Sequence, residues 1–196
     1  MSIHDELILE LIKPDKWGKP TGYIVNIVGT SNIKCKVEES VRFVREVHPY
    51  IPSRIKRIYY QLVEGLPTET VIEEMTPDII VEILGSTSKE KELVAIELET
   101  DMDFDFGKSL RQIKKYARRF KEVIIVIPKE YERFAVLYKN EGFRVYLWEA
   151  TRIWECMRCG NTTEERKSIK PKCSRKSCRS TEQRLKGAKN VTFKEA

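Results

Sequence analysis

The chain has 196 residues, 41% hydrophobic and 34% charged, with a formal net charge of +6. This length suits one domain with an appendage, and the composition excludes a disordered chain in favour of a folded protein with a heavily charged surface. No apolar run approaches the ~20 residues that a membrane-spanning helix requires.

The composition and the N-terminus also bear on where the protein works. Glu, Lys and Arg are abundant whereas Gln is scarce, a balance typical of thermophilic proteins. The opening stretch MSIHDELILELIK is acidic and amphipathic, unlike a signal peptide. We therefore expect a cytoplasmic protein with no membrane partner.

The first third of the chain is predicted to contain helices and two strands. Apolar residues at helical spacing predict a helix over 3–13, which Pro14 ends. The apolar run at 23–28 is interpreted as a strand. Further elements are expected as helices over 37–47 and 53–64 and as a strand over 69–75.

Three residues of this region have reactive or titratable side chains of interest. Cys35 is expected to be a small buried thiol. His4 and His48 are lone histidines, for which a structural role is expected instead of a catalytic one.

The stretch from 76 to 150 alternates strand and helix signals. β-branched residues predict strands over 78–84 and 93–99, joined by a short polar turn. The elements expected after them are a helix over 107–120, a strand over 122–127, a helix over 130–141 and a strand over 143–150. This order predicts a mixed sheet flanked by helices, with a helical crossover between two of its strands.

Three acidic residues fall at the ends of two neighbouring predicted strands. Asp78 opens the first strand after Pro77, and the second strand carries Glu97 and Glu99. Because strand side chains alternate between faces, both glutamates should lie on one side of the sheet. Carboxylates among apolar neighbours are unfavourable unless they hold a metal, pair with cations or lie at an exposed end. The alternatives are a turn-capping role for Asp78 and a solvated Glu99.

These positions favour a site for a hard divalent cation. Mg²⁺ or Mn²⁺ takes oxygen ligands, keeps few protein carboxylates and can activate a water that attacks a phosphodiester. The predicted ligands are Asp78, Glu97 and the backbone carbonyl of Leu98. The acidic residues that follow are interpreted as a solvated turn: Asp101, Asp103 and Asp105.

The pattern resembles the PD-(D/E)xK nuclease superfamily, which includes restriction endonucleases, Holliday-junction resolvases and RecB-like and Cas4-like nucleases. The resemblance covers roughly residues 66–150 and is carried by the Pro-Asp dipeptide, the Glu-x-Glu pair and the helical Gln112-x-x-x-Tyr116. It implies a restriction-endonuclease-like α/β fold and metal-dependent DNA cleavage. The residues that would be catalytic are Asp78, Glu97, Glu99 and Gln112.

One position departs from the family pattern. Where the family usually has Lys, this chain has Glu99, which would act as a general base or as a further metal ligand. Gln112 would contact a phosphate or the water of the metal. The departure leaves open a catalytically inactive nuclease fold.

The helix predicted over 107–120 is strongly basic. Part of it is expected to line a phosphate-binding groove, with a solvated face as the alternative. The residues assigned there to nucleic-acid binding are Lys108, Arg111, Lys115 and Tyr116, and packing is an equal alternative for the Tyr116 ring.

Four cysteines near the C-terminus have a spacing similar to that of a zinc ribbon. Cys156-x₂-Cys159 and Cys173-x₄-Cys178 are separated by thirteen residues, and Gly160 supplies the backbone freedom of a knuckle. Two such turns present four thiolates to one tetrahedral Zn²⁺ and leave no open position, so the expected site is structural. Disulfides are the alternative, which an intracellular setting disfavours.

The C-terminal segment is also basic. Residues 151–196 contain 13 Lys and Arg but 5 Asp and Glu, a formal +8, whereas residues 1–150 sum to −2. This asymmetry indicates a polyanionic partner, with Arg175, Lys176 and Arg179 as nucleic-acid contacts. DNA is expected in preference to RNA, without base specificity because phosphate contacts carry none.

Together these patterns predict three regions. They are a helical or mixed segment over 1–65, whose helix over 53–64 joins the core, a nuclease core over 66–150 and a basic zinc ribbon over 151–196. The predicted function is a metal-dependent DNA endonuclease. The alternatives are an inactive nuclease-fold protein that binds DNA or regulates, and a zinc-ribbon module that docks onto a protein assembly. Many relatives cut as dimers, which leaves a homodimer open.

Overall fold

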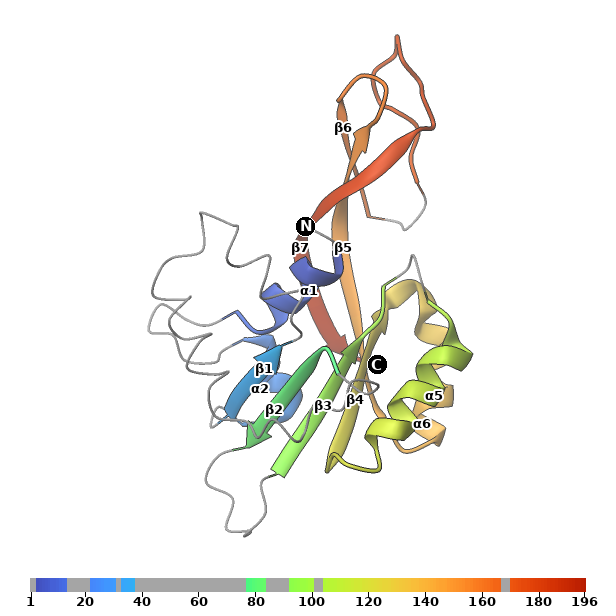
Figure 1. Cartoon of the computed structure of the whole chain (residues 1–196). Helices are drawn as coiled ribbons and strands as arrows, with labels where there is room; N and C mark the ends of the chain where they lie inside the picture. Colours follow the sequence, from blue (N-terminus) through green and yellow to red (C-terminus); the bar gives the residue numbers. More distant parts are fainter. Residues whose placement is uncertain are drawn as a thin grey trace.

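The computed structural model describes residues 3–13, 22–30, 33–37, 77–83, 92–100, 104–166 and 170–196, and Figure 1 shows them arranged around one sheet. The predicted helix over 53–64, the strand over 69–75 and His48 lie outside these residues, as does the helix over 37–47 apart from its first residue. No helix within the described ranges is long and apolar enough to cross a membrane.

Within the described residues, seven strands form a mixed sheet in the order β1-β2-β3-β4-β5-β6, and β7 pairs with the edge of β5 opposite β4 and β6. Neighbouring strands are antiparallel except for β3-β4 and β4-β5, which are parallel. The mixed α/β class predicted from the sequence is therefore confirmed. The strands are β1 (Ile33–Val37), β2 (Ile79–Ile83), β3 (Glu92–Leu98), β4 (Glu122–Pro128), β5 (Arg144–Cys156), β6 (Thr162–Glu165) and β7 (Gln183–Glu195).

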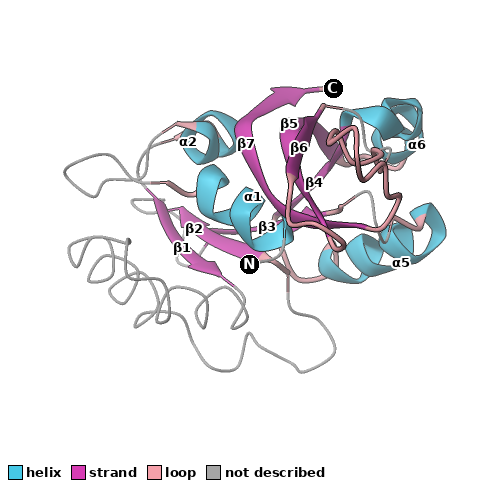
Figure 2. Ribbon diagram, turned by 90° about the horizontal axis from the view of Figure 1, so that it is seen from above, coloured by secondary structure: helices cyan, strands magenta, loops and turns pink. Residues whose placement is uncertain are grey.

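Helices cover both faces of the sheet, as Figure 2 shows from above. On one face, α1 (Ile3–Leu11) and α2 (Tyr23–Val28) pack on one apolar cluster. On the other face, α5 (Phe106–Tyr116), the 3₁₀ helix η2 (Lys129–Phe134) and α6 (Ala135–Asn140) pack on a second cluster. The result is a sheet buried between two helical layers.

The alternation of β3 assigns its side chains to the two layers. Ile96 and Leu98 belong to the cluster under α1 and α2, and Ala95 belongs to the cluster under α5. Because successive strand residues point to opposite faces, Glu97 and Glu99 project on the α5 side. The i, i+2 spacing thus places both glutamates on one face.

The run at 23–28, interpreted as a strand, is the helix α2, so that interpretation is wrong. Ile24 and Ile27, three residues apart, are both buried against the sheet. Gly29 then ends the helix in the left-handed conformation (φ 82°), and its N–H donates to the carbonyl of Val25. A run of six apolar or neutral residues fits the repeat of a helix as well as that of a strand, and here the glycine C-cap favours the helix.

Other predicted elements differ in extent. The helix expected over 107–120 ends at Tyr116, and the helix over 130–141 is divided into η2 and α6. The strand expected over 143–150 continues to Cys156, across the boundary predicted between residues 150 and 151. β1 was not predicted: its last residue, Val37, was assigned to a helix. β7 was treated as part of a basic tail, yet it is a 13-residue strand.

Cys35 lies in β1 and is buried, as predicted, with 5% of its surface exposed. Burial raises the pKa of its thiol to about 12 because the low-dielectric core disfavours the thiolate. Cys35 is therefore an inert core residue and takes no part in the cysteine cluster near the C-terminus.

Candidate functional site

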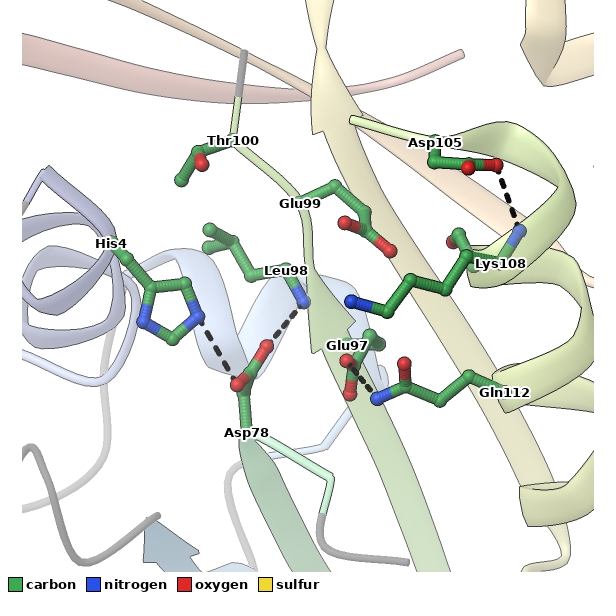
Figure 3. A pocket seen from close by; sticks show the side chains of 10 residues that line it. His4, Asp78, Glu97, Leu98, Glu99, Thr100, Asp105, Lys108 and Gln112 are labelled. Carbon is green, nitrogen blue, oxygen red and sulfur yellow. Dashed lines mark hydrogen bonds and ion pairs between the residues drawn. The ribbon is translucent and has the colours of Figure 1, made fainter. Parts of the chain in front are cut away.

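A polar pocket of about 290 Å³ lies at one end of the sheet, where β3 ends and β2 begins. The first turns of α1 and α5 close it from two sides, as Figure 3 shows. The residues that supply its ionisable and amide groups are His4, Asp78, Glu97, Glu99, Asp105, Lys108 and Gln112. The structure thus brings together the four residues predicted to be catalytic, and adds a histidine, a lysine and a further aspartate.

Asp78 is fixed by the antiparallel pairing of β2 with β3. Ile79, the first residue of β2, pairs with Ile96 of the antiparallel strand β3. Asp78, the residue before β2, therefore lies beside Glu97. Asp78 is 7% exposed, and its Oδ2 accepts a hydrogen bond of 2.7 Å from the backbone N–H of Leu98. Its Oδ1 lies 3.1 Å from Nε2 of His4. Both carboxylate oxygens are therefore oriented by protein groups.

Glu97 has a buried carboxylate, and only one of its two oxygens has a hydrogen-bond partner among the described residues. It is 7% exposed, and its Oε1 accepts a hydrogen bond of 2.6 Å from Nε2 of Gln112. Its Oε2 is buried and has no hydrogen-bond partner among the residues that the structure describes. Burial, with the negative charges of Asp78 and Glu99 nearby, raises the pKa of Glu97 well above 4.5. A buried carboxylate in this state requires a proton or a cation.

Glu99 lies one step further toward solvent on the same face. Burial is the main cause that raises the pKa of its carboxyl above 4.5, opposed by a hydrogen bond with Ser109. The charge of Asp78 raises this pKa further, whereas the ammonium of Lys108 lowers it. Figure 3 shows the Lys108 side chain extending from α5 into the space between Glu97 and Glu99.

The first turn of α5 is held in place by its N-cap and by a buried hydroxyl pair. Asp105, interpreted from the sequence as part of a solvated turn, is the N-cap, and its Oδ1 accepts a 2.9 Å hydrogen bond from the N–H of Lys108. Ser109 is buried, and its Oγ accepts a 2.9 Å hydrogen bond from the hydroxyl of Tyr138 on α6. These contacts fix the turn that carries Lys108 over the acidic residues.

Gln112 and Tyr116 lie one helical turn apart and act as a pair. Nε2 of Gln112 donates to Glu97 and, at 2.7 Å, to the hydroxyl of Tyr116. Tyr116 is 1% exposed. The nucleic-acid contact predicted for Tyr116 is therefore corrected: the ring lies in the core, and its hydroxyl orients Gln112. The Gln112 amide nitrogen is occupied by these two partners.

The remaining predicted nucleic-acid contacts lie in two separate places. Arg111 and Lys115 are exposed on α5 beside the pocket. Arg175, Lys176 and Arg179 are exposed in the segment that carries the last two cysteines. The structure therefore does not gather these cations into one continuous patch around the pocket.

The four cysteines converge at the far end of β5. Sγ of Cys156 lies 3.7 Å from Sγ of Cys178, and Sγ of Cys159 lies 3.6 Å from Sγ of Cys173. All four sulfurs lie within 4.8 Å of one another. A tetrahedral Zn²⁺ with Zn–S bonds of about 2.3 Å separates its sulfurs by about 3.8 Å. The cluster can thus hold one metal ion, consistent with zinc.

Two tight turns present these sulfurs. Gly160 adopts φ 70°, and its N–H donates a 2.8 Å hydrogen bond to the carbonyl of Cys156. The N–H of Cys178 donates to the carbonyl of Arg175 at 2.9 Å. In the described ranges, only the cysteines place three or more metal-ligating atoms close enough to share one ion as they stand. The carboxylates of the pocket would need to rotate toward a shared ion.

Sequence reasoning missed two residues of the pocket. His4 was given a structural role, and no local pattern places the first turn of α1 beside Asp78, because that contact spans more than seventy residues. Lys108 was assigned only to nucleic-acid binding. Its position three residues after the N-cap Asp105 would have placed it at the start of a helix that faces β3.

Comparison of the chain with family models, with curated proteins and with solved structures finds no match.

Proposed function

We propose that the protein is a metal-dependent nuclease that hydrolyses phosphodiester bonds of DNA at the acidic pocket. The unpartnered Oε2 of Glu97, buried beside Asp78 and Glu99, carries this proposal. Such an atom is unfavourable in the unliganded protein and becomes favourable when a cation binds to it. The raised pKa of Glu97 indicates the same need for positive charge.

The donor set of the pocket suits a hard divalent cation. Asp78 and Glu97 offer carboxylate oxygens, and Leu98 offers a backbone carbonyl between the two glutamates. The N–H and C=O of a strand residue point to the same edge, and the Leu98 N–H points at Asp78. The Leu98 carbonyl is thus on the correct edge to join them. Mg²⁺ or Mn²⁺ accepts such oxygen ligands and leaves positions for phosphate and water.

Each residue of the pocket then has a chemical task. A bound divalent cation polarises the phosphoryl group and lowers the pKa of a coordinated water. Glu99, whose raised pKa makes it a better proton acceptor, takes the proton from the attacking water. Lys108 offsets the negative charge that develops on the phosphate, the task that the usual family lysine would have at the position of Glu99. Gln112 orients Glu97 in place of the phosphate contact predicted for it.

The strand order supports this proposal. The antiparallel strands β1, β2 and β3 precede the helix α5, which leads to the parallel strand β4. The antiparallel pair β2-β3 followed by a helical crossover to β4 matches the order predicted over 78–127, whereas the strand predicted over 69–75 lies outside the described residues. Asp78 precedes β2, Glu97 lies near the end of β3 and Glu99 follows that strand, which supports the resemblance to the PD-(D/E)xK superfamily.

The cysteine cluster is proposed to hold a structural Zn²⁺. Four thiolates fill a tetrahedral shell and leave no open position for substrate. The ion would fix the two turns that carry Arg175, Lys176 and Arg179, and so present these cations to nucleic acid. A Cys₄ centre with Zn²⁺ has a charge of −2, and the +8 of residues 151–196 leaves this segment basic.

The test is cleavage of supercoiled plasmid and of single-stranded DNA with Mg²⁺ or Mn²⁺, by zinc-loaded protein. Asp78→Ala and Glu97→Gln should reduce the rate at least about 10³-fold, and Lys108→Ala about 10²-fold, because each removes a group that acts in the transition state. Lys114→Ala, an exposed cation on the same helix that pairs with Glu141 outside the pocket lining, is the matched control and should cut within about threefold of wild type. Cutting that survives both acid variants would place the activity elsewhere.

A second candidate is a nuclease fold that binds DNA without cutting it, which the glutamate at position 99 favours. Divalent-metal affinity separates the two functions. Calorimetric titration with Mn²⁺ should give one site that Glu97→Gln removes if the pocket is catalytic, whereas an inactive binding protein has no need of that site.

A third candidate, a zinc-ribbon module that docks on a protein assembly, is favoured by Met157. This side chain is 59% exposed on the turn between Cys156 and Cys159. Salt-sensitive binding of naked DNA would argue against this candidate, because electrostatic contacts to phosphates weaken steeply with ionic strength.

A further inference from the structure

The cysteine cluster stands away from the pocket on an arm formed by the later part of β5, the short strand β6 and the earlier part of β7 (Figure 1). The indole N–H of Trp148 in β5 donates a 2.8 Å hydrogen bond to the carbonyl of Glu99, which places Trp148 level with the pocket edge. Cys156 follows eight residues later in the same strand. At about 3.3 Å per residue, the rise along β5 from the level of the pocket to the cluster is at most about 26 Å.

The base of the arm is fixed to the core. The carboxylate of Glu6 on α1 accepts a hydrogen bond from the N–H of Ala188 in β7. Gly187 leaves room for this approach: a Cβ there would lie 2.7 Å from a carboxylate oxygen of Glu6, so that side chain would have to shift. His4, on the same helix, contacts Asp78. One helix therefore touches both the arm and the acidic pocket, and it holds the distance between them.

The cations along the shaft of the arm, residues 183–189 of β7, are compensated by acidic partners. Arg184 and Lys186 pair with Glu155 at 2.5 and 3.6 Å, and Lys189 pairs with Glu164 at 2.6 Å. Their charges are thus largely neutralised within the arm.

The cations at the tip, the cysteine turns and residues 170–181, are not compensated in this way. No acidic residue occurs over 170–181. Six exposed cations form no ion pair with any residue in the part of the chain that the structure describes: Arg158, Lys170, Lys172, Arg175, Lys176 and Arg179. Positive charge is therefore concentrated at the end of the arm.

We propose that the tip binds the phosphate backbone of the same nucleic acid that enters the pocket, and that the arm sets a fixed span between the two contacts. The substrate class is a stiff duplex. With 3.4 Å per base pair, a rise of about 26 Å corresponds to at most about eight base pairs between the phosphate at the pocket and the phosphates at the tip. This inference rests on the proposed function only for the pocket contact; the tip contact stands on the charge distribution alone.

The test is the affinity of zinc-loaded protein for duplexes of 4 to 16 base pairs, measured by fluorescence anisotropy with Ca²⁺ in place of Mg²⁺. Wild type should gain at least about tenfold in affinity between 6 and 10 base pairs, where both contacts become available together. The tip variant Arg175→Ala/Lys176→Ala/Arg179→Ala should gain no more than the threefold or so expected from additional binding positions on a longer duplex. For this variant on the 16-base-pair duplex, the slope of log affinity against log salt concentration should also fall by the amount expected for about three phosphate contacts.

The matched control removes three cations from the shaft: Arg184→Ala/Lys186→Ala/Lys189→Ala. It loses the same formal charge and should keep the affinity step. The charge-preserving variant Arg175→Lys/Arg179→Lys should keep it too, and zinc content shows whether each variant retains the cysteine cluster.

Two outcomes would overturn the inference: an affinity that rises smoothly with length in wild type, or a step that the tip variant retains. The same duplexes incubated with Mg²⁺ test the proposed function separately. An affinity step without cutting refutes only the nuclease, and cutting without a step refutes only the span. A step on single strands equal to that on duplexes would contradict the duplex assignment.

Discussion

Glu97 combines burial, two acidic neighbours and an oxygen without a hydrogen-bond partner among the described residues, so its protonation contributes to the stability of the metal-free protein. Its pKa in the folded state lies above the unfolded value of 4.5. The folded state therefore binds this proton more tightly, and its contribution to the free energy of unfolding is full below pH 4.5 and is lost as the pH rises through the raised pKa.

Glu97→Gln should remove this pH dependence, because the amide carries no charge. Without Mg²⁺ or Mn²⁺, the variant is expected to be more stable than wild type by about 1–3 kcal/mol at pH 8 and by less at pH 5.5. Thermal unfolding of zinc-loaded protein at both pH values measures this. The control is Glu92→Gln at the start of β3, a half-buried carboxylate outside the pocket that pairs with Lys121. Equal stability of Glu97→Gln and wild type at pH 8 would contradict the assignment.

The helix α1 is the element that supports the pocket from the side opposite α5. His4 places Nε2 3.1 Å from Oδ1 of Asp78. Groups that orient metal-binding carboxylates typically change metal affinity by 10- to 100-fold when they are removed. α1 is thus expected to position Asp78 without touching the substrate.

His4→Ala should weaken Mn²⁺ binding about tenfold in calorimetric titration, with the fold and the zinc content unchanged. His4→Gln, which keeps a donor near the same position, should recover part of the loss. Glu10→Ala, on the last turn of α1 away from the pocket, is the control. An unchanged Mn²⁺ affinity in His4→Ala would show that the histidine only packs against Asp78.

At the scale of elements, local periodicity predicted most of the core strands but not those whose partners lie far along the chain. The alternation in IKCKV was a readable strand signal for β1, although the following helix pattern obscured it. β7 gave a weak signal because it is largely exposed and its pairing with β5 is interrupted by two register shifts. Its apolar residues that pack against the core are Leu185, Ala188, Val191 and Phe193.

The candidate site was predicted to a similar extent. Strand alternation and the short connection between β2 and β3 place Asp78, Glu97 and Glu99 together, and helix spacing adds Gln112. His4 could not be predicted, because its place depends on the packing of α1 against β7 through Glu6. Local sequence patterns therefore predict where the acidic residues lie, whereas the residues that contact them depend on the tertiary fold.

At the scale of the whole molecule, the cysteine cluster and the α/β core are stabilised by different interactions. The two turns that carry the cysteine pairs depend on the cluster, whereas the core depends on apolar burial on both faces of the sheet. Removal of zinc by a chelator should therefore expose these turns to protease while the core stays folded.

Thiol titration at pH 8 measures this directly. The zinc-loaded protein should show no rapidly reactive thiol, the chelated protein four and the denatured protein five, because burial holds the pKa of Cys35 at about 12. Five reactive thiols on chelation alone would show that the core unfolds with the cluster. The variant Cys35→Ser removes one thiol from the denatured count and none from the chelated count.

The paired strands of the arm also make its length adjustable by small insertions. Two residues added to each of β5 and β7 between the pocket level and the cysteines would preserve which side chains face inward, since strands repeat every two residues. The cluster would move outward by about 6.6 Å, close to two base pairs of duplex. An insertion of an odd number of residues would instead turn the cysteines to the opposite face. The arm can therefore be lengthened with its cluster intact only by an even number of residues in each strand.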